Sequence, residues 1–350
     1  MKASYAKYRL MFKQPAGTSR GVLHEKETYF LRLEDEDTPG VFGLGECAVF
    51  RGLSADDVPG YEDKLRELCV NICHDRDTDL ADFPSLKFGL ETAICDFANG
   101  CRRTPFPSEF TEGRLEIPIN GLVWMGTREE MLARIDEKIK AGFTTIKLKV
   151  GAIDTESELD LVRHIRRVFP PEVLTIRLDA NGGFTPDNAM QKLESFARYG
   201  IHSIEQPIRQ HQWEAMARIC ANSPISVALD EELIGINTPK AMGEMLDAIH
   251  PQFIILKPSL VGGFTGSSEW MRQAAMRDIG GWITSALESN VGLNAIAQWT
   301  AQMGARLPQG LGTGALFTNN IGSPLEQVRD VVRFNPDKQW QLPDFNWQEV

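Results

Sequence analysis

The segment TTIKLKV, residues 144–150, decides how this 350-residue chain is expected to fold. Its apolar residues alternate with Lys147 and Lys149, and alternate side chains of a strand project to opposite faces. The two lysines therefore share one face, and the apolar side chains pack against helices on the other. This pattern predicts a barrel strand with both lysines turned to the interior, and a solvent-facing edge strand is the alternative.

Comparable apolar runs recur along the chain, and a helix-sized segment fills each gap. The first such helix is expected over 127–141, where Thr127 and Glu130 form a capping box. A repeated βα unit predicts either an eight-unit barrel or an open doubly wound sheet. The expected strands are LEIPIN (115–120), TTIKLKV (144–150), VLTIRLD (173–179), HSIE (202–205), ISVALD (225–230), FIILK (253–257) and WITSAL (282–287), with an eighth near 310–312.

Four of these strands end in an ionisable residue: Asp179, Glu205, Asp230 and Lys257. A single acid in such a position is usually a helix N-cap or a solvated loop residue. Here the acids recur on consecutive βα units, and the carboxyl ends of barrel strands meet at one rim. The recurrence therefore favours a barrel with three carboxylates and a lysine at its mouth.

Three carboxylates without histidine or cysteine are typical ligands of a hard cation, Mg²⁺ or Mn²⁺. A second lysine and a dication nearby lower the pKa of a lysine, so that a neutral amine can act as a base. Lys149 lies nearer the rim than Lys147 and is the better-placed base, while Lys257 approaches from across the mouth. These residues predict removal of a proton next to a metal-bound carboxylate.

Residues 1–103 predict a small α+β unit that ends in a helix over 85–97, with Ser85 as the N-cap and Leu90 and Ile94 on the apolar face. The pattern changes near residue 115, which marks a boundary between two parts of the chain.

Composition excludes several classes of partner. The net charge of −11 would repel nucleic acid and anionic membranes, and no long basic run offsets it. No apolar run is long enough to span a membrane, and the first residues lack a secretory signal. The six cysteines form no CxxC pair, which favours a reducing cytoplasm.

Five motifs resemble, in order and spacing, the muconate-lactonizing subgroup of the enolase superfamily: TIKLKVG, RLDANGGF, IEQP, ALDEEL and ILKPSLVGG. Within the subgroup, the o-succinylbenzoate synthase family is the most similar, through PAGTSRGVL, FGLGECA, SALESNVGLNAIAQ and GLGTGALF. The resemblance implies an α/β fold: a modified (β/α)7β TIM barrel over residues 115–315, capped by residues 1–103 together with a C-terminal segment, 316–350, that returns to the cap.

The resemblance also implies roles for individual residues. It implies metal ligands at Asp179, Glu205 and Asp230, and catalytic lysines at Lys149 and Lys257. Gln206, which follows the middle ligand, varies among relatives, and Glu288 is a weaker candidate for the site. Substrate contacts are implied for Lys147, Ser285, Gly310 and Gly312, and two closing loops are implied at Thr18, Ser19 and Arg20 and at Phe50 and Arg51.

The implied reaction is the loss of water from 2-succinyl-6-hydroxy-2,4-cyclohexadiene-1-carboxylate to give 2-succinylbenzoate in menaquinone biosynthesis. Lys149 would remove the α-proton and return it to the departing hydroxide on the same face. N-acylamino acid racemase, dipeptide epimerase and cycloisomerase activities use the same residues and remain alternatives, as does a non-catalytic metal-binding barrel. The motifs leave the oligomeric state open.

Overall fold

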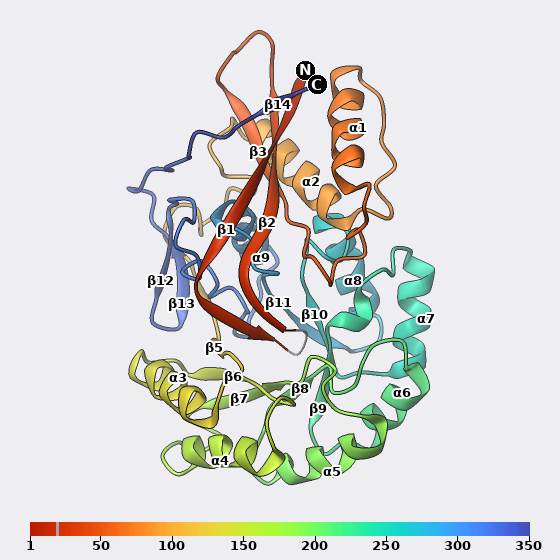
Figure 1. Cartoon of the computed structure of the whole chain (residues 1–350), viewed down its shortest axis with the longest axis vertical. Coiled ribbons are helices and arrows are strands. Elements are labelled where there is room, and N and C mark those ends of the chain that lie inside the picture. Colours follow the sequence, from red (N-terminus) through yellow and green to blue (C-terminus); the bar gives the residue numbers. More distant parts are fainter. Residues whose placement is uncertain (19–20) are drawn as a thin grey trace.

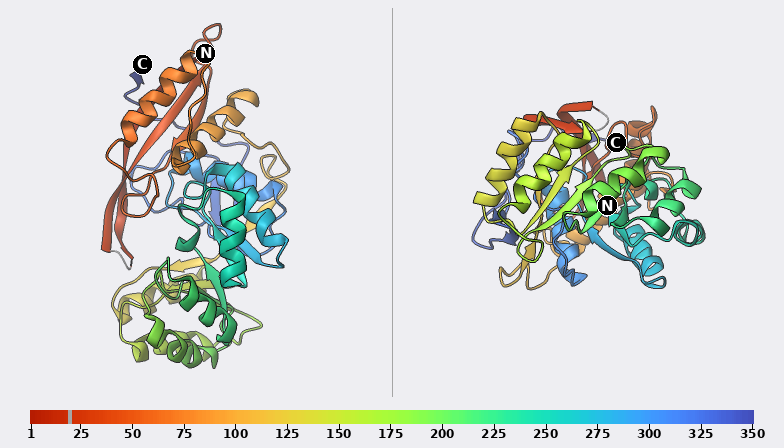
Figure 2. Two further views of the ribbon diagram at one scale, coloured as in Figure 1. Left: turned by 90° about the vertical axis from the view of Figure 1, so that its right-hand side faces the viewer. Right: turned by 90° about the horizontal axis from the view of Figure 1, so that it is seen from below.

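The computed structural model describes residues 1–18 and 21–350. An elongated cap stands over a ring of strands and helices, and the two chain termini lie together at the far end of the cap (Figure 1). Viewed from the side and from below, the helices of the lower part surround its strands (Figure 2). No helix in the described ranges has the length and apolar character needed to cross a membrane.

The cap is built on a four-stranded antiparallel sheet in the order β14-β1-β2-β3. The long hairpin of β1 (Lys2–Thr18) and β2 (Gly21–Glu34) reaches down to the barrel, and its register shifts between Met11 and Ala16. Helices α1 (Tyr61–Cys73) and α2 (Pro84–Ala98) pack on this sheet, α1 against β1 and α2 against β3 (Phe42–Cys47). The last strand, β14 (Gln348–Glu349), pairs with β1, so the end of the chain joins the cap.

The expectation that Ser85 caps helix α2 is wrong. The helix begins at Pro84, after Phe83 in the N-cap position. Asp56 supplies the cap from another segment, because its Oδ2 accepts hydrogen bonds from the Ser85 amide at 2.8 Å and hydroxyl at 2.7 Å. The expected apolar face is also partly wrong, since Ile94 is 50% exposed and the helix packs through a neighbouring face.

The buried Asp56 predicts a pH-dependent stability. Burial raises its pKa from 3.8 to about 6, although the hydrogen bonds from Ser85 act in the opposite sense. The folded state therefore binds more protons than the unfolded state between these two values, and this contribution to stability is lost as the pH rises through that window. Asp56→Asn cannot titrate, so its stability relative to the wild type should increase from pH 4 to pH 6.5, by up to about 3 kcal/mol.

Urea unfolding of both proteins across this pH range measures the effect. Asp57→Asn is the matched control, because burial of Asp57 is outweighed by hydrogen bonds from Gly52 and Arg51 that lower its pKa. The stability of the control relative to the wild type should change little over this range, because Asp57 titrates below its usual pKa of 3.8 in the folded state. If the stability of Asp56→Asn and of the wild type changed with pH in the same way, the raised pKa of Asp56 would be contradicted.

The barrel confirms the expected class of fold. Seven parallel strands form one sheet in the order β11-β10-β9-β8-β7-β6-β5, and isolated bridges from Ile119 to Gln309 and from Thr284 to Gly310 close it in place of an eighth strand. Because β6 lies between β5 and β7, the edge-strand alternative for Lys147 and Lys149 is excluded. The units are β5 (Gly121–Val123), α3 (Arg128–Lys140), β6 (Thr145–Lys149), α4 (Thr155–Arg166), β7 (Thr175–Asp179), α5 (Pro186–Ala197), β8 (Ser203–Glu205), α6 (Trp213–Asn222), β9 (Ser226–Leu229), α7 (Pro239–Ile249), β10 (Phe253–Leu256), α8 (Gly263–Ala275), β11 (Gly280–Ile283) and α9 (Asn290–Gln302).

Two expected barrel strands differ in the structure. Residues 115–120 were expected to form the first strand, but β4 (Glu116–Pro118) joins a separate antiparallel sheet with β12 (Leu325–Val328) and β13 (Val331–Phe334). An alternating apolar pattern suits a strand of the barrel sheet and a strand of the three-stranded sheet equally, so it does not indicate which strand β4 pairs with. The expected strand over 282–287 begins and ends earlier, and Thr284–Leu287 instead line the barrel mouth.

The core explains why the lysine strand folds as it does. Ile146 and Leu148 are fully buried in the large apolar cluster between the sheet and its helices. Helix α3 begins at the predicted capping box, in which Thr127 and Glu130 each bond to the other's backbone amide. With the apolar face of β6 packed outward, Lys147 and Lys149 are left on the inner face.

Candidate active site

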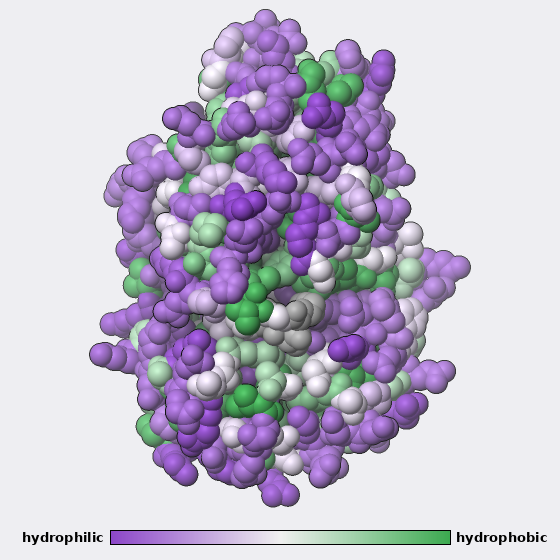
Figure 3. All heavy atoms as spheres, viewed as in Figure 1, coloured by the Kyte–Doolittle hydropathy of each residue, from purple (hydrophilic) through white to green (hydrophobic). Residues whose placement is uncertain are grey.

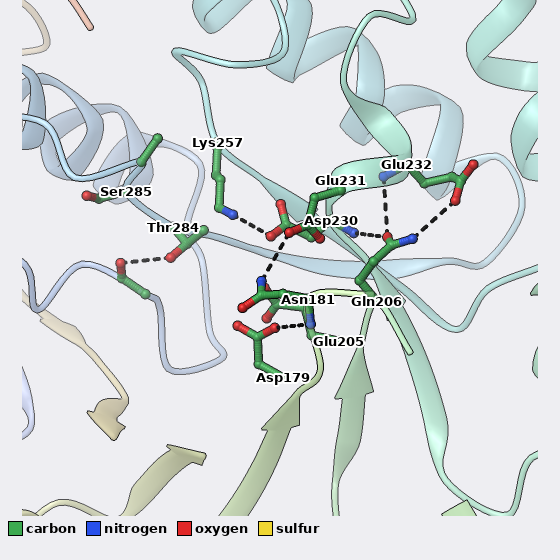
Figure 4. A network of polar contacts seen from close by, with 12 residues as sticks. Asp179, Asn181, Glu205, Gln206, Asp230, Glu231, Glu232, Lys257, Thr284 and Ser285 are labelled. Carbon is green, nitrogen blue, oxygen red and sulfur yellow. Dashed lines mark hydrogen bonds and ion pairs between the residues drawn. The ribbon is translucent and has the colours of Figure 1, made fainter. Parts of the chain in front are cut away.

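The carboxyl ends of five neighbouring strands present the candidate site at one rim. Lys149, Asp179 and Glu205 are Cα partners across β6, β7 and β8, so they stand at one level of the sheet. Asp230 follows β9 and Lys257 follows β10. Figure 4 shows Asp179, Glu205, Asp230 and Lys257 converging from these strand ends. The structure therefore brings together the five residues that the sequence placed at the rim.

The two lysines of β6 engage the first two carboxylates. Lys147 Nζ lies 2.8 Å from Asp179 Oδ2 and 2.6 Å from Glu205 Oε2. Lys149 Nζ lies 2.9 Å from Asp179 Oδ2, and it also donates a hydrogen bond to Asn181 Oδ1. Both ammonium groups are buried at the base of the pocket, where charge interactions are screened little by water.

Lys257 approaches from the other side of the mouth, on β10, and forms an ion pair with Asp230 Oδ2. Its strand is separated from the lysine strand β6 by the three strands that carry the acids. Burial would lower the pKa of Lys257, but Asp230, Glu231 and Glu205 raise it. Lys257 is therefore held as an ammonium ion beside the acids.

The acids respond differently to their surroundings. Burial would raise the pKa of Asp179, but Lys147 and Lys149 lower it well below its usual range. Burial and the negative charge of Asp179 raise the pKa of Glu205 to about 8, although Lys147 opposes the shift. A carboxylate in such a position favours a further positive charge close to it.

The donor set fits a hard divalent cation. Glu205 Oε1 is buried and has no hydrogen-bond partner in the described part of the chain, which leaves an oxygen ligand unsatisfied. In the present arrangement the carboxylates contact lysines, and no three acidic, histidine or cysteine side chains within residues 1–18 and 21–350 already enclose an ion. Asp179, Glu205 and Asp230 are the residues that would hold such a cation.

Two amide side chains at the rim were not assigned a role from the sequence. Asn181 connects the segments after β7 and β9, since its Nδ2 donates to Glu231 Oε1 at 3.1 Å and its backbone N donates to Asp179 Oδ1 at 3.0 Å. Its φ of 43° is unusual for a residue other than glycine, and such strain is common at functional sites. The DAN sequence directly after a strand was the local signal that could have found it.

Gln206 fixes the segment after Asp230. Its Oε1 accepts from the backbone N of Asp230 at 3.2 Å and of Glu232 at 3.3 Å, and its Nε2 donates to Glu232 Oε2 at 3.2 Å (Figure 4). Gln206 is fully buried. Gln206 thus holds Asp230 in place through the Asp230 backbone.

The expected substrate residues line the same pocket but differ in what they contact. Lys147, Ser285, Gly310 and Gly312 are all on its wall. Gly310 is also required by packing, because a Cβ there would lie 1.8 Å from Thr284 Oγ1. Ser285 Oγ lies 2.8 Å from Thr313 Oγ1. A further wall residue, unassigned from the sequence, is Trp124, whose ring centre lies 5.8 Å from Lys149 Nζ.

Two residues of the cap lie at the mouth of the pocket. Phe50 and Leu53 line the pocket, and apolar side chains gather across the middle of the face in Figure 3, between cap and barrel. Arg51 instead forms ion pairs with Glu27 at 2.6 Å and with Asp57 at 2.8 Å, outside the pocket lining. Of the other expected closing loop, Thr18 ends β1, while Ser19 and Arg20 lie outside the described residues.

A capped parallel barrel with acids and lysines at the ends of successive strands defines the class of protein. The chain belongs to the enolase superfamily, and residues 130–332 match the family model described as enolase C-terminal domain-like. Enzymes of this superfamily use a divalent metal ion. The resemblance seen in the motifs is thereby confirmed.

Individual relatives give a more specific similarity than the family model does. The chain is 46% identical to the o-succinylbenzoate synthase of Desulfotalea psychrophila, over 93% of this chain and 96% of that protein. The crystal structure of MenC from the same organism superposes with a TM-score of 0.85 at 42% identity, covering 95% of this chain and 99% of that one. A substrate-liganded L-Ala-D/L-Glu epimerase from Bacillus subtilis has a TM-score of 0.81 at 21% identity over 95% and 96% of the two chains, and shows the shared fold.

Proposed function

We propose that this chain is an o-succinylbenzoate synthase, a hydro-lyase that removes water from 2-succinyl-6-hydroxy-2,4-cyclohexadiene-1-carboxylate to give 2-succinylbenzoate. The main support is the arrangement of charged residues at the barrel rim. Lys149, Asp179 and Glu205 stand at one level of the sheet, and Asp230 and Lys257 follow the next two strands. The 46% identity to an enzyme of this name, over nearly the whole chain, supports the same reaction.

The charge of the pocket supports an anionic substrate. Within residues 1–18 and 21–350, its charged lining residues are three lysines and one aspartate: Lys147, Lys149, Lys257 and Asp179. The ammonium group of a dipeptide would be repelled by these three lysines. The one acid in the lining, Asp179, is already paired with two of them. A dicarboxylate is better matched, and this favours dehydration over the epimerisation of dipeptides.

Lys149 is the proposed base, because it stands at the strand end and its partners Asp179 and Asn181 hold Nζ at the pocket floor. It removes the α-proton and can return it to the leaving hydroxide, since both lie on one face of the substrate. Lys257 opposes the developing negative charge from the other side. Asp179, Glu205 and Asp230 would hold a divalent cation, which when bound would supply the positive charge that makes this proton acidic.

One observation favours a second activity. Lys149 and Lys257 enter from strands separated by the three acid-bearing strands, so a substrate between them has a lysine on each side. An N-acylamino acid, which carries no free ammonium, could lose its α-proton to one lysine and regain a proton from the other. We therefore propose weak N-acylamino acid racemase activity beside the main reaction.

The setting of the reaction is part of the proposal. Mg²⁺ fits the all-oxygen donor set, with Mn²⁺ as the substitute. The six cysteines are all free thiols, which suits a reducing cytoplasm. In that compartment the proposed reaction would serve menaquinone biosynthesis.

The test is a direct assay of the purified chain with Mg²⁺. We expect dehydration of 2-succinyl-6-hydroxy-2,4-cyclohexadiene-1-carboxylate, followed by ultraviolet absorbance and identified by the mass of 2-succinylbenzoate. N-succinylamino acids and L-Ala-L-Glu are the comparison substrates, followed by polarimetry. A kcat/KM for dipeptide epimerisation above that for dehydration would contradict the proposed function.

A further inference from the structure

A buried cluster of charged side chains lies in the seam between cap and barrel, apart from the rim. Lys26 of β2, Glu46 of β3 and Glu288 of the loop between β11 and α9 are at most 6% exposed. Both acids approach Gly292 of α9, where a Cβ would lie 2.9 Å from Glu46 Oε2 and 2.8 Å from Glu288 Cβ. The carboxylate of a cap residue and the aliphatic stem of a barrel residue thus meet at a single backbone position.

Lys26 faces this cluster from the cap. It is the cross-strand partner of Leu10, so the two side chains share one face of the hairpin, and Leu10 packs against Leu287 of the barrel loop. Lys26 Nζ is buried without a hydrogen-bond partner among the described residues. Burial lowers the pKa of Lys26, whereas Glu46 and Glu288 raise it. The net effect lowers the pKa, so the two carboxylates offset only part of the cost of burying the ammonium.

Glu46 attaches the cap to the start of helix α9. Its Oε1 accepts from the Ser289 amide at 2.9 Å, and its Oε2 accepts from the Ser289 hydroxyl at 2.6 Å and from the Gly292 amide at 2.9 Å. A carboxylate at a helix N-terminus is favoured by the helix dipole. This contact fixes where the loop before α9 ends.

Glu288 holds the wall of the pocket itself. Its Oε2 accepts from the Ala286 amide at 2.7 Å, and its Oε1 accepts from Ser259 Oγ, two residues after Lys257. Leu287, on the same wall, has a φ of 62°, which is strained for a branched residue and persists only where neighbouring contacts impose it. The contacts of Glu288 thus keep the 284–287 wall and the Lys257 segment in a fixed relation.

We propose that Glu288 and Lys26 are positioning residues of the active site: Glu288 holds the 284–287 wall against the Lys257 segment, and Lys26 provides from the cap the positive charge that the buried acids need. This inference rests on the proposed function. Without Lys26, two buried carboxylates remain uncompensated, and water is expected to enter the seam and loosen the wall.

The first test compares charges within the cluster. Lys26→Met should lower kcat by on the order of 10- to 100-fold, because small displacements of positioned groups have effects of this size. Adding Glu288→Gln should restore kcat to within about threefold of the Glu288→Gln single variant, since one uncompensated carboxylate, Glu46, then remains in place of two, and the glutamine can accept from the Ala286 amide and donate to Ser259 Oγ. Lys2→Met, at an exposed position of the same sheet, is the control and should match the wild type.

The second test does not depend on turnover. Deuterium exchange of backbone amides, read by mass spectrometry, should be faster over 284–289 in Lys26→Met than in the wild type, and should slow again in the double variant. Lys26→Gln provides the same comparison if the methionine variant does not fold. A wild type inactive on the proposed substrate would count against the function alone, because the exchange result would still stand.

Two outcomes would overturn the proposal. One is a Lys26→Met variant with lowered thermal stability but with unchanged kcat and unchanged exchange over 284–289, which would make the cluster merely structural. The other is a loss of kcat that Glu288→Gln does not reverse, which would show that the charge balance is not what positions the wall.

Discussion

Lys149→Ala is expected to lower turnover by at least about 10³-fold, since removal of a positioned general base costs about this much. The physical reason is local: Lys149 is paired with one carboxylate, Asp179, whereas the lysine beside it is held by two. Lys147 lies next to it, but its ammonium is held between Asp179 and Glu205 at 2.8 and 2.6 Å. Dehydration measured under single-turnover conditions reports the effect on the chemical step.

The control for this variant is Lys140→Ala, at an exposed position of helix α3, which should keep wild-type turnover. Lys149→Arg tests charge alone, since a guanidinium keeps the positive charge but does not lose its proton at neutral pH. It should be nearly as inactive as Lys149→Ala. An active arginine variant would show that the charge at this position matters and that the base is elsewhere.

Asp230→Asn is expected to weaken Mg²⁺ binding by on the order of 100-fold or more, because changes even to outer ligand contacts cost 10- to 100-fold. The fold should survive, since asparagine keeps the shape of the side chain and an oxygen that can accept from Lys257. Titration calorimetry measures the affinity, and the rise in Tm on adding Mg²⁺ gives an independent value. Treatment with a chelator should abolish wild-type turnover, and Mg²⁺ or Mn²⁺ should restore it.

The matched control is Asp187→Asn, an exposed acid in the first turn of α5 that does not line the pocket. It should bind Mg²⁺ as the wild type does. An unchanged Mg²⁺ affinity in Asp230→Asn would remove this residue from the metal site. Full activity of the wild type after complete metal removal would contradict the metal-dependent mechanism as a whole.

The residues at the rim could be predicted from the sequence because the end of each parallel strand determines where its last side chain lies. Once TTIKLKV is a barrel strand, the alternation places Lys147 and Lys149 on its inner face, and parallel strands must end at the same rim. The capping box at Thr127 and Glu130 was equally local, since both partners lie within one helical turn. Signals of this kind need no knowledge of distant contacts.

The features that were missed depend on distant contacts. Asp56 caps helix α2 from 29 residues away, so the nearer Ser85 was the more natural choice. The apolar alternation over 115–120 does not reveal that its partner is β13 and not the barrel. In the sequence, Lys26 resembles any polar residue of a hairpin strand. Its burial depends on the barrel loop that packs against its face of the hairpin, which only the structure shows.

The most direct measurement of the central claim is exchange of the substrate α-proton with solvent deuterium, followed by NMR in Lys149→Ala and Lys257→Ala. Both variants should have lost turnover, the first because the base is gone and the second because positive charge opposite the developing anion is gone. Lys257→Ala should still show slow Mg²⁺-dependent exchange, and Lys149→Ala should show none. Exchange in Lys149→Ala with none in Lys257→Ala would assign the base to Lys257 and contradict the account.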